Sequence, residues 1–309
     1  MRHLGWLVTL WLPGALFAQA PTGTHIPLSS GALAEPEALY ASPTRIDRIG
    51  RIVAPVMING QGPFRLVVDT GASHTTLTPE LATRLGLQMG GAESGVMLNG
   101  VTGAEMVPAV TIARLQAGDL VVEGARAPVI TTDIMGGADG ILGIAGLLNE
   151  RIFVDFQHDR IKIARSKNQP EDRMLLRIPA QRIAGGLLMV SARVGGVSVR
   201  AIIDTGAERS LGNAALADAL RKRRRLFAPR PTVVFGTTAA VTDGEVRGIP
   251  PVTLGDATIS DVNLVFGDFH IFKVWDLNDK PTMLIGMDVL GTVGQLIIDY
   301  RRREVYVSS

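Results

Sequence analysis

The sequence predicts a mainly β fold built from two similar halves, with a few short helices. The chain of 309 residues is long enough for two domains, each with its own core. Short runs rich in Val, Ile, Leu and Thr alternate with Gly, Pro, Asn and Asp, which is typical of strands joined by turns. Four blocks of sequence occur twice in the same order, which indicates an internal duplication.

The strongest repeated block is LVVDTGA at residues 66–72, which matches AIIDTGA at residues 201–207. The other three pairs are residues 101–112 with 241–254, residues 140–143 with 283–286, and residues 153–156 with 297–300. A gene duplication and fusion explains this order. We therefore predict an N-terminal lobe at residues 48–165, a polar linker at 166–177 and a C-terminal lobe at 178–309.

Strands are expected where apolar β-formers cluster, and helices where apolar residues follow a helical spacing. The clearest strand candidates are residues 64–68, 110–113, 199–203 and 262–266. The helix candidates are residues 79–85, 213–220, 144–150 and 287–290. Each half is thus expected to be mostly β.

The N-terminus predicts export from the cytoplasm. Arg2 and His3 precede an apolar run that ends in Ala18-Gln19-Ala20, so residues 1–20 resemble a cleavable secretory signal. An uncleaved anchor in the inner membrane is the alternative. Residues 21–47 are rich in Pro, Ser, Ala, Gly and Thr and predict a flexible leader. The expected location is therefore outside the cytoplasm, in a bacterial periplasm, with no integral membrane span after cleavage.

Composition excludes several classes of function. The chain has 31 basic and 29 acidic residues, and a net charge of +2 gives no long-range field for capturing nucleic acid. It has no cysteine, so disulfides, thiolate metal sites and a cysteine nucleophile are excluded. The five histidines are scattered without the spacing of metal ligands. We expect no metal and no cofactor.

The Asp-Thr-Gly copies are the candidate catalytic elements. In each, a run of apolar β-formers ends at an aspartate, Asp69 or Asp204, and a glycine two residues later permits a tight turn. A single copy would most simply be a turn in which the aspartate caps backbone amides. Two copies in equivalent places favour a shared role.

These residues resemble the aspartic peptidases. The motifs at 69–73 and 204–208 and the apolar-apolar-Gly motifs at 141–143 and 284–286 are similar to the retropepsin branch, but here both lobes lie in one chain, as in pepsin. The resemblance implies two acid-protease lobes, β-barrel-like, with a cleft between them. It assigns Asp69 and Asp204 as the catalytic dyad. The residues that it implies support the dyad are Thr70, Gly71, Thr205, Gly206, Gly143 and Gly286.

Two carboxylates explain peptide hydrolysis without a metal. One must accept a proton from water while the other donates a proton to the substrate. Two carboxyl groups about 3 Å apart cannot both ionise, so they share one proton; this enzyme family is the standard example of that behaviour. The expected activity is that of an aspartic endopeptidase acting on an extended peptide or protein.

The sequence departs from the pepsin pattern beside the dyad. Ala72 and Ala207 stand where pepsin-like enzymes carry a hydroxyl, so we expect a less acidic activity optimum than pepsin's. Ser73 and Glu208 follow, and the resemblance to retropepsins makes them candidate substrate contacts. The alternative for Glu208 is a solvated carboxylate.

Flaps that close over the cleft are expected at residues 99–105 and 238–245, with Gly100, Gly103 and Gly244 at mobile tips. Neither segment contains the tyrosine of pepsin-like flaps. Ordinary surface turns would have the same composition.

One other segment attracts attention. Residues 221–225, Arg-Lys-Arg-Arg-Arg, could bind a polyanion or anionic lipid, but they also suit a solvated helix end.

Taken together, the motifs and the N-terminal segment predict a monomeric, bilobal, exported aspartic endopeptidase. The alternative is a catalytically silent protein that keeps the fold and binds peptides.

Overall fold

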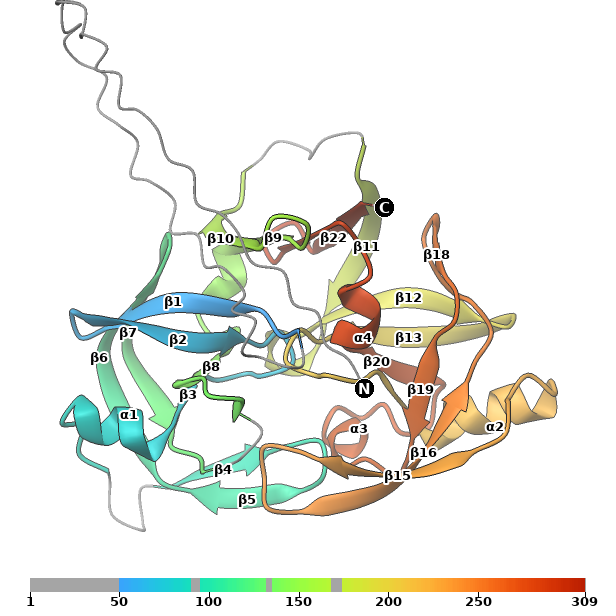
Figure 1. Ribbon diagram of the computed structural model, residues 1–309, viewed down its shortest axis with the longest axis horizontal. Coiled ribbons are helices and arrows are strands. Elements are labelled where there is room, and N and C mark those ends of the chain that lie inside the picture. The colour runs from blue at the N-terminus through green and yellow to red at the C-terminus, as the bar shows by residue number, and fades with distance from the viewer. Residues whose placement is uncertain (1–49, 90–94, 132–134, 168–173, 309) are drawn as a thin grey trace, which may run out of the picture. The chain divides into compact units, whose positions relative to one another are not determined.

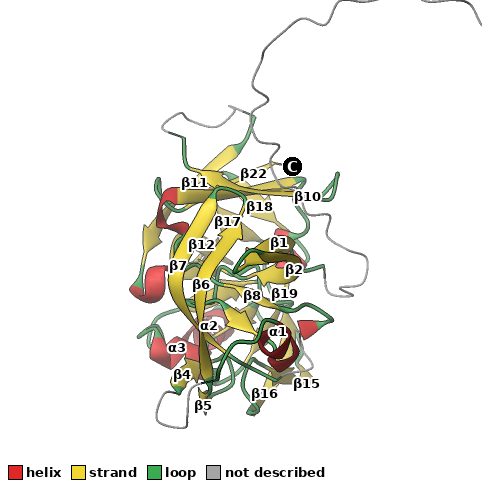
Figure 2. Cartoon of the chain, turned by 90° about the vertical axis from the view of Figure 1, so that its left-hand side faces the viewer, coloured by secondary structure: helices red, strands yellow, loops and turns green. Residues whose placement is uncertain are grey.

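The computed structural model describes residues 50–89, 95–131, 135–167 and 174–308 (Figure 1). The predicted signal and leader, residues 1–47, lie outside these ranges, as do residues 168–173 of the predicted linker. Within them, no helix has the length and apolar character needed to cross a bilayer. Figure 2 shows strands through most of the described chain and only short helices, so the predicted mainly β class is confirmed.

The first repeat is built on a sheet of six strands among the described residues, in the order β3-β8-β2-β1-β6-β7. The central hairpin β1–β2 is antiparallel, and β2 pairs in parallel with β8. The elements of this sheet and its helix are β1 (Val53–Ile58), β2 (Gln61–Val68), β3 (Thr76–Leu77), α1 (Pro79–Arg84), β6 (Ala109–Ala117), β7 (Leu120–Pro128) and β8 (Gly140–Leu142).

The second repeat uses the same plan, since the hairpin β12–β13 is antiparallel and β13 pairs in parallel with β20. The hairpin β17–β18 extends from β12. The elements are β12 (Leu188–Val194), β13 (Val197–Ile203), β14 (Leu211–Gly212), α2 (Ala214–Lys222), β15 (Arg230–Phe235), β16 (Val241–Gly248), β17 (Val252–Leu254), β18 (Ala257–Ile259), β19 (Asn263–Phe266), α3 (His270–Val274), β20 (Thr282–Ile285) and α4 (Met287–Leu290).

A third group of strands joins the two repeats. β9 of the first repeat pairs with β21 of the second, in a register that sets Phe153 opposite Ile297. One sheet of 14 described strands therefore runs from β10 to β15 and contains strands of both repeats. The joining strands are β9 (Glu150–Asp155), β10 (Arg160–Arg165), β11 (Leu176–Arg182), β21 (Gln295–Asp299) and β22 (Glu304–Ser308). The repeats are consequently bound by backbone hydrogen bonds as well as by a linker.

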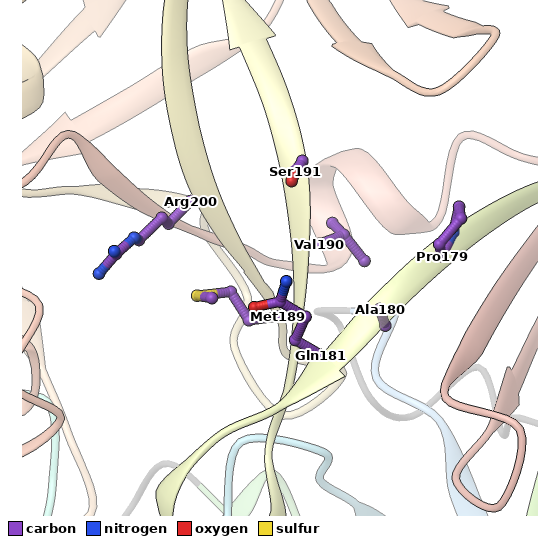
Figure 3. Close-up of a pocket in the computed structure, with 7 residues that line it drawn as sticks. All are labelled: Pro179, Ala180, Gln181, Met189, Val190, Ser191 and Arg200. Atoms are coloured by element: carbon purple, nitrogen blue, oxygen red, sulfur yellow. The ribbon is translucent and has the colours of Figure 1, made fainter.

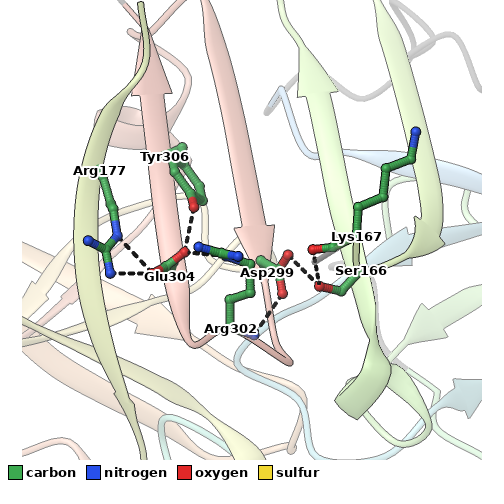
Figure 4. A network of polar contacts seen from close by, with 7 residues as sticks. All are labelled: Ser166, Lys167, Arg177, Asp299, Arg302, Glu304 and Tyr306. Atoms are coloured by element: carbon green, nitrogen blue, oxygen red, sulfur yellow. Dashed lines mark hydrogen bonds and ion pairs between the residues drawn. The ribbon is translucent and has the colours of Figure 1, made fainter. Parts of the chain in front are cut away.

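Polar contacts fasten the two end residues of the predicted linker, Ser166 and Arg177, to the hairpin β21–β22 (Figure 4). Ser166 donates a hydrogen bond of 2.7 Å to Asp299 Oδ2, and Arg177 Nε donates one of 2.7 Å to Glu304 Oε1. Burial alone would raise the pKa of Glu304, but hydrogen bonds from Tyr306, Arg302 and Arg177 lower it below its usual value. Glu304 therefore stays charged where Arg177 holds the start of β11.

The helices agree with the sequence patterns in three of the four predicted places. α1 begins after Thr78, whose side chain accepts the amide of Leu81, and α2 begins after Asn213, which accepts the amide of Leu216. The helix predicted at residues 144–150 is wrong, because only the short 3-10 turn η3 (Leu147–Asn149) forms before β9 starts. The sequence patterns also missed α3, whose β-branched and aromatic residues favour a strand.

The joining sheet yields a stability prediction. Leu296 of β21 is fully buried, so Leu296→Ala should lower the free energy of unfolding by about 2–5 kcal/mol through lost burial and a residual cavity. Leu148→Ala is the matched control, because Leu148 is 46% exposed and should cost about 1 kcal/mol or less. Urea unfolding followed by circular dichroism measures both. Equal losses would contradict the placement of Leu296 in the core.

Candidate active site

Two equivalent strands deliver the two aspartates. β2 ends at Val68, directly before Asp69, and β13 ends at Ile203, directly before Asp204. Each aspartate amide still donates to the neighbouring parallel strand: Asp69 N to Leu142 O at 3.0 Å, and Asp204 N to Ile285 O at 3.0 Å. The last ladder bond of each parallel pair therefore fixes the start of each aspartate loop.

Four hydrogen bonds between Thr70 and Thr205 and the opposite strand ends hold the loops together. Thr70 Oγ1 donates to Ile203 O at 2.7 Å, and Thr205 Oγ1 donates to Val68 O at 2.6 Å. Each hydroxyl also accepts the other threonine's amide, at 3.1 and 3.2 Å. Both threonines are buried, so these bonds satisfy groups that water does not reach.

The two glycines after the threonines let the carboxyl groups approach the opposite loop. A Cβ added to Gly71 would lie 2.3 Å from Asp204 Oδ2, and one added to Gly206 would lie 2.1 Å from Asp69 Cγ. Each glycine amide donates to the Oδ1 of its own aspartate, at 2.8 Å for Asp69 and 2.9 Å for Asp204. The structure thus brings both aspartates and their four neighbours into one compact group.

The carboxyl groups interact electrostatically. Burial raises the pKa of Asp69, while the hydrogen bond from the Gly71 amide and the charge of buried Arg51 act in the opposite direction. Burial, the nearby charge of Asp69 and the hydrogen bond between the two side chains raise the pKa of Asp204 well above its usual value. Asp204 is only 6% exposed. Such a pair loses its two protons in separate steps and holds one of them in between.

Gly143 and Gly286 lie against the backbone of the loops that follow the two aspartates. A Cβ on Gly143 would lie 2.5 Å from the carbonyl carbon of His74, and one on Gly286 would lie 2.8 Å from Ala207 O. Larger residues would push the aspartate loops out of place.

The sequence reading missed two hydroxyl groups that support these loops. Thr75 Oγ1 accepts the Gly143 amide at 3.3 Å, and Ser210 Oγ accepts the Gly286 amide at 3.0 Å. Ser210 in turn donates to Asp288 Oδ1 at 2.7 Å. The sequence could have indicated this role, because Thr75 and Ser210 follow their aspartates by the same number of positions.

Two hairpins meet at their tips. The first is β4 (Val96–Asn99) with β5 (Ala104–Val107), where the Gly100 amide donates to Gly103 O at 2.8 Å. The second is β15–β16, whose turn covers residues 236–240. Thr102 Oγ1 lies 3.2 Å from Thr238 Oγ1, and Glu105 accepts the Ala239 amide at 3.2 Å.

Both predicted flap segments therefore form hairpins, with one correction. Gly244 does not lie at a tip, because β16 begins at Val241 and sets Gly244 opposite Thr232. There it packs on Val265, to which an added Cβ would come within 3.0 Å. The tip glycine of this hairpin is Gly236, which lies against Thr102.

The predicted substrate contacts beside the dyad differ in surroundings. Ser73 is partly exposed and lies against Gly185, in the turn η4 (Ala184–Gly186) before β12. Glu208 is exposed, and its backbone carbonyl accepts the amide of Asp288 at 3.1 Å. The carboxylate of Glu208 has no polar partner in the described part of the chain. Its exposure suits both a substrate contact and a solvated carboxylate.

Two other features bear on ligands. Within the described ranges, no group of three His, Asp or Glu side chains could hold a metal ion. A pocket of about 350 Å³ is lined by residues of β11, β12 and β13 (Figure 3), and neither aspartate lines it. Its lining residues are Pro179, Ala180, Gln181, Met189, Val190, Ser191 and Arg200.

Comparison with known proteins agrees with this geometry. The family model for aspartyl proteases matches residues 54–145 and 190–289, which together are more than half of the chain. The chain therefore belongs to the aspartyl protease family. Each matched range contains one Asp-Thr-Gly motif and one apolar-apolar-Gly motif. A search of curated proteins found no matching sequence.

The threonine hydrogen bonds yield a first prediction for the site. Thr205→Val keeps the shape of the side chain but leaves the buried Thr70 amide and Val68 carbonyl without a partner. Each of these two unpaired backbone groups should lower the free energy of unfolding by about 1–3 kcal/mol. Thr205→Ser retains the hydroxyl and should cost clearly less. Chemical denaturation of both variants tests this, and a Val variant as stable as the Ser variant would disprove it.

A second prediction concerns Asp204 and pH. The native state keeps a proton that the unfolded chain loses near pH 3.8, so stability falls as pH rises above that value. Asn does not ionise in either state, so Asp204→Asn removes this loss and should raise the unfolding free energy at pH 7 above that of the wild type. The gain should vanish below pH 3.8. Asp256→Asn is the exposed control and should change stability by less than about 0.5 kcal/mol at either pH.

Proposed function

We propose that the protein is an aspartic endopeptidase in which Asp69 and Asp204 activate a water molecule. The observation that supports this most directly is the approach of the two carboxyl groups, one from each repeat, to each other's loop glycines. The family to which the chain belongs supports a peptidase. Membership alone leaves open whether the site is active, and the dyad geometry favours activity.

The shared proton is the basis of the mechanism. In the singly charged pair, the ionised carboxylate accepts a proton from water as the water attacks the peptide carbonyl carbon. The protonated carboxyl donates its proton to the carbonyl oxygen, which gives a tetrahedral gem-diol. When this intermediate collapses, the C–N bond breaks and the leaving nitrogen takes a proton from one carboxyl group. The other, ionised carboxylate takes a proton from a gem-diol hydroxyl, so the pair is singly charged again. The amides of Gly71 and Gly206 orient the carboxyl groups throughout.

The substrate should be an extended peptide that lies between the dyad and the two hairpins. In the structure, Thr102 contacts Thr238 and Glu105 accepts a hydrogen bond from the Ala239 amide. These contacts between the hairpin tips must break for a polypeptide to enter. Backbone groups around Gly100 and Gly103 could then pair with the peptide. Ser73 and Glu208 are the proposed contacts beside the scissile bond.

We further propose that the protein acts as an exported monomer. Two aspartates within one chain complete the dyad without a second copy. The apolar run near the N-terminus supports a secretory signal and a periplasmic location. Residues 21–47 would then link the signal to the first repeat.

The test is cleavage of a diverse mixture of unstructured peptides between about pH 3 and pH 8, with fragments identified by mass spectrometry. Asp69→Asn and Asp204→Asn should each lower the cleavage rate at least about a thousandfold, because each removes half of the acid–base pair. Asp256→Asn should cleave like the wild type. Because burial raises the pKa of both carboxyls, we expect the activity maximum above pH 3.8.

Each alternative gives a different result. Equal cleavage by wild type and Asp69→Asn would assign the activity to another site or a contaminant. No cleavage by any form, together with peptide binding that survives in Asp69→Asn, would favour a silent peptide-binding protein. An activity maximum below about pH 3 would contradict the predicted effect of Ala72 and Ala207.

A further inference from the structure

The strongest local charge on the described chain lies outside the dyad and the hairpin tips. Residues 221–230 carry six of the 31 basic residues of the protein and no acidic residue. Without this segment the acidic residues outnumber the basic ones, although the whole chain has a net charge of +2. Positive charge is therefore concentrated at one place on a nearly neutral protein.

The structure exposes this segment. It begins in the last turn of α2, on the right of Figure 1, and ends where β15 starts. All six cationic residues are exposed, and one of them, Arg221, pairs with Asp218 of the same helix. The exposed basic residues are Arg221, Lys222, Arg223, Arg224, Arg225 and Arg230.

A helix end does not account for the whole segment. Cations stabilise the last turn of a helix, which here contains Arg221 and Lys222, but this effect fades beyond the helix. The first repeat is an internal comparison, since α1 occupies the equivalent place and is followed by Leu85-Gly86-Leu87-Gln88-Met89. Arg84 is the only basic residue there. The second repeat thus carries extra cations that the shared fold does not need.

An exposed aromatic side chain lies within the basic segment. Phe227 is 65% exposed, although its ring touches Gly248 and its carbonyl accepts a 3.1 Å hydrogen bond from Arg247. The backbone is therefore held while the ring stays largely in solvent. Cations beside an exposed aromatic ring match a lipid surface, where phosphates bind the cations and the ring enters the acyl boundary.

We propose that residues 221–230 form a docking surface for an anionic phospholipid bilayer. The cations would bind lipid phosphate groups, and Phe227 would insert between the lipids. This binding is peripheral and is independent of the proposed catalytic activity. It would hold the enzyme near substrates at a membrane surface.

The test is sedimentation of the full chain with vesicles of phosphatidylcholine that contain about one third phosphatidylglycerol. The triple variant Lys222→Gln/Arg224→Gln/Arg225→Gln should bind these vesicles roughly ten- to a hundredfold more weakly, because each cation contributes to binding at an anionic surface. Pure phosphatidylcholine should bind wild type weakly. Because every form keeps residues 1–20, any contribution of the N-terminal apolar run cancels in the comparison.

A matched control removes the same charges elsewhere. Lys280→Gln/Arg301→Gln/Arg303→Gln also replaces one lysine and two arginines, all exposed, and should bind vesicles nearly as well as wild type. If both triple variants lose affinity equally, net charge rather than this surface drives binding and the proposal fails. The proposal also fails if the 222/224/225 variant binds like wild type.

Phe227 distinguishes a membrane from a soluble polyanion. Phe227→Ala should weaken vesicle binding about three- to tenfold, and the loss should persist at high salt, where charge attraction is screened. Heparin should bind wild type and Phe227→Ala equally and should dissociate at high salt. If Phe227→Ala binds vesicles like wild type while heparin competes fully, the segment is a general polyanion site and the membrane proposal is wrong.

Discussion

The reciprocal hydrogen bonds of Thr70 and Thr205 are the constraint on which the candidate site depends. Two carboxyl groups repel each other when both are ionised and lose solvation when buried, so the hydrogen bond between the two side chains does not by itself hold them together. The opposing force comes from neighbouring groups: each threonine hydroxyl bonds to the strand end of the other repeat. The strands that precede the aspartates, β2 and β13, pair in parallel with β8 and β20, so the threonine hydrogen bonds are anchored to the buried strands of each repeat.

Much of this arrangement could be predicted from the sequence, because the residues concerned lie in short motifs that occur once in each repeat. The Asp-Thr-Gly motifs and the glycines at 143 and 286 are short, repeated and preceded by buried strands, so their equivalence pointed to one shared place. Helices α1 and α2 were also predictable, since Thr78 and Asn213 are good N-caps before apolar residues.

The contacts between the repeats could not be read in the same way. β9 and β21 carry one of the repeated blocks, but their residues do not specify a partner strand. The pairing depends on which sheet edges the folded repeats leave open. The contact between Thr102 and Thr238 depends equally on where two hairpins end in space. Gly244 was misplaced for a related reason: a glycine marks a turn and a tightly packed strand alike.

The joining sheet also decides how the dyad responds to dilution. If the two repeats were separate chains, the aspartates would meet only in a dimer, and the site would disappear below the dissociation constant. Here β9 and β21 belong to one polypeptide, so the association is intramolecular and its effective concentration does not change with the amount of protein. A single molecule can therefore keep its two aspartates together however far it is from the next one.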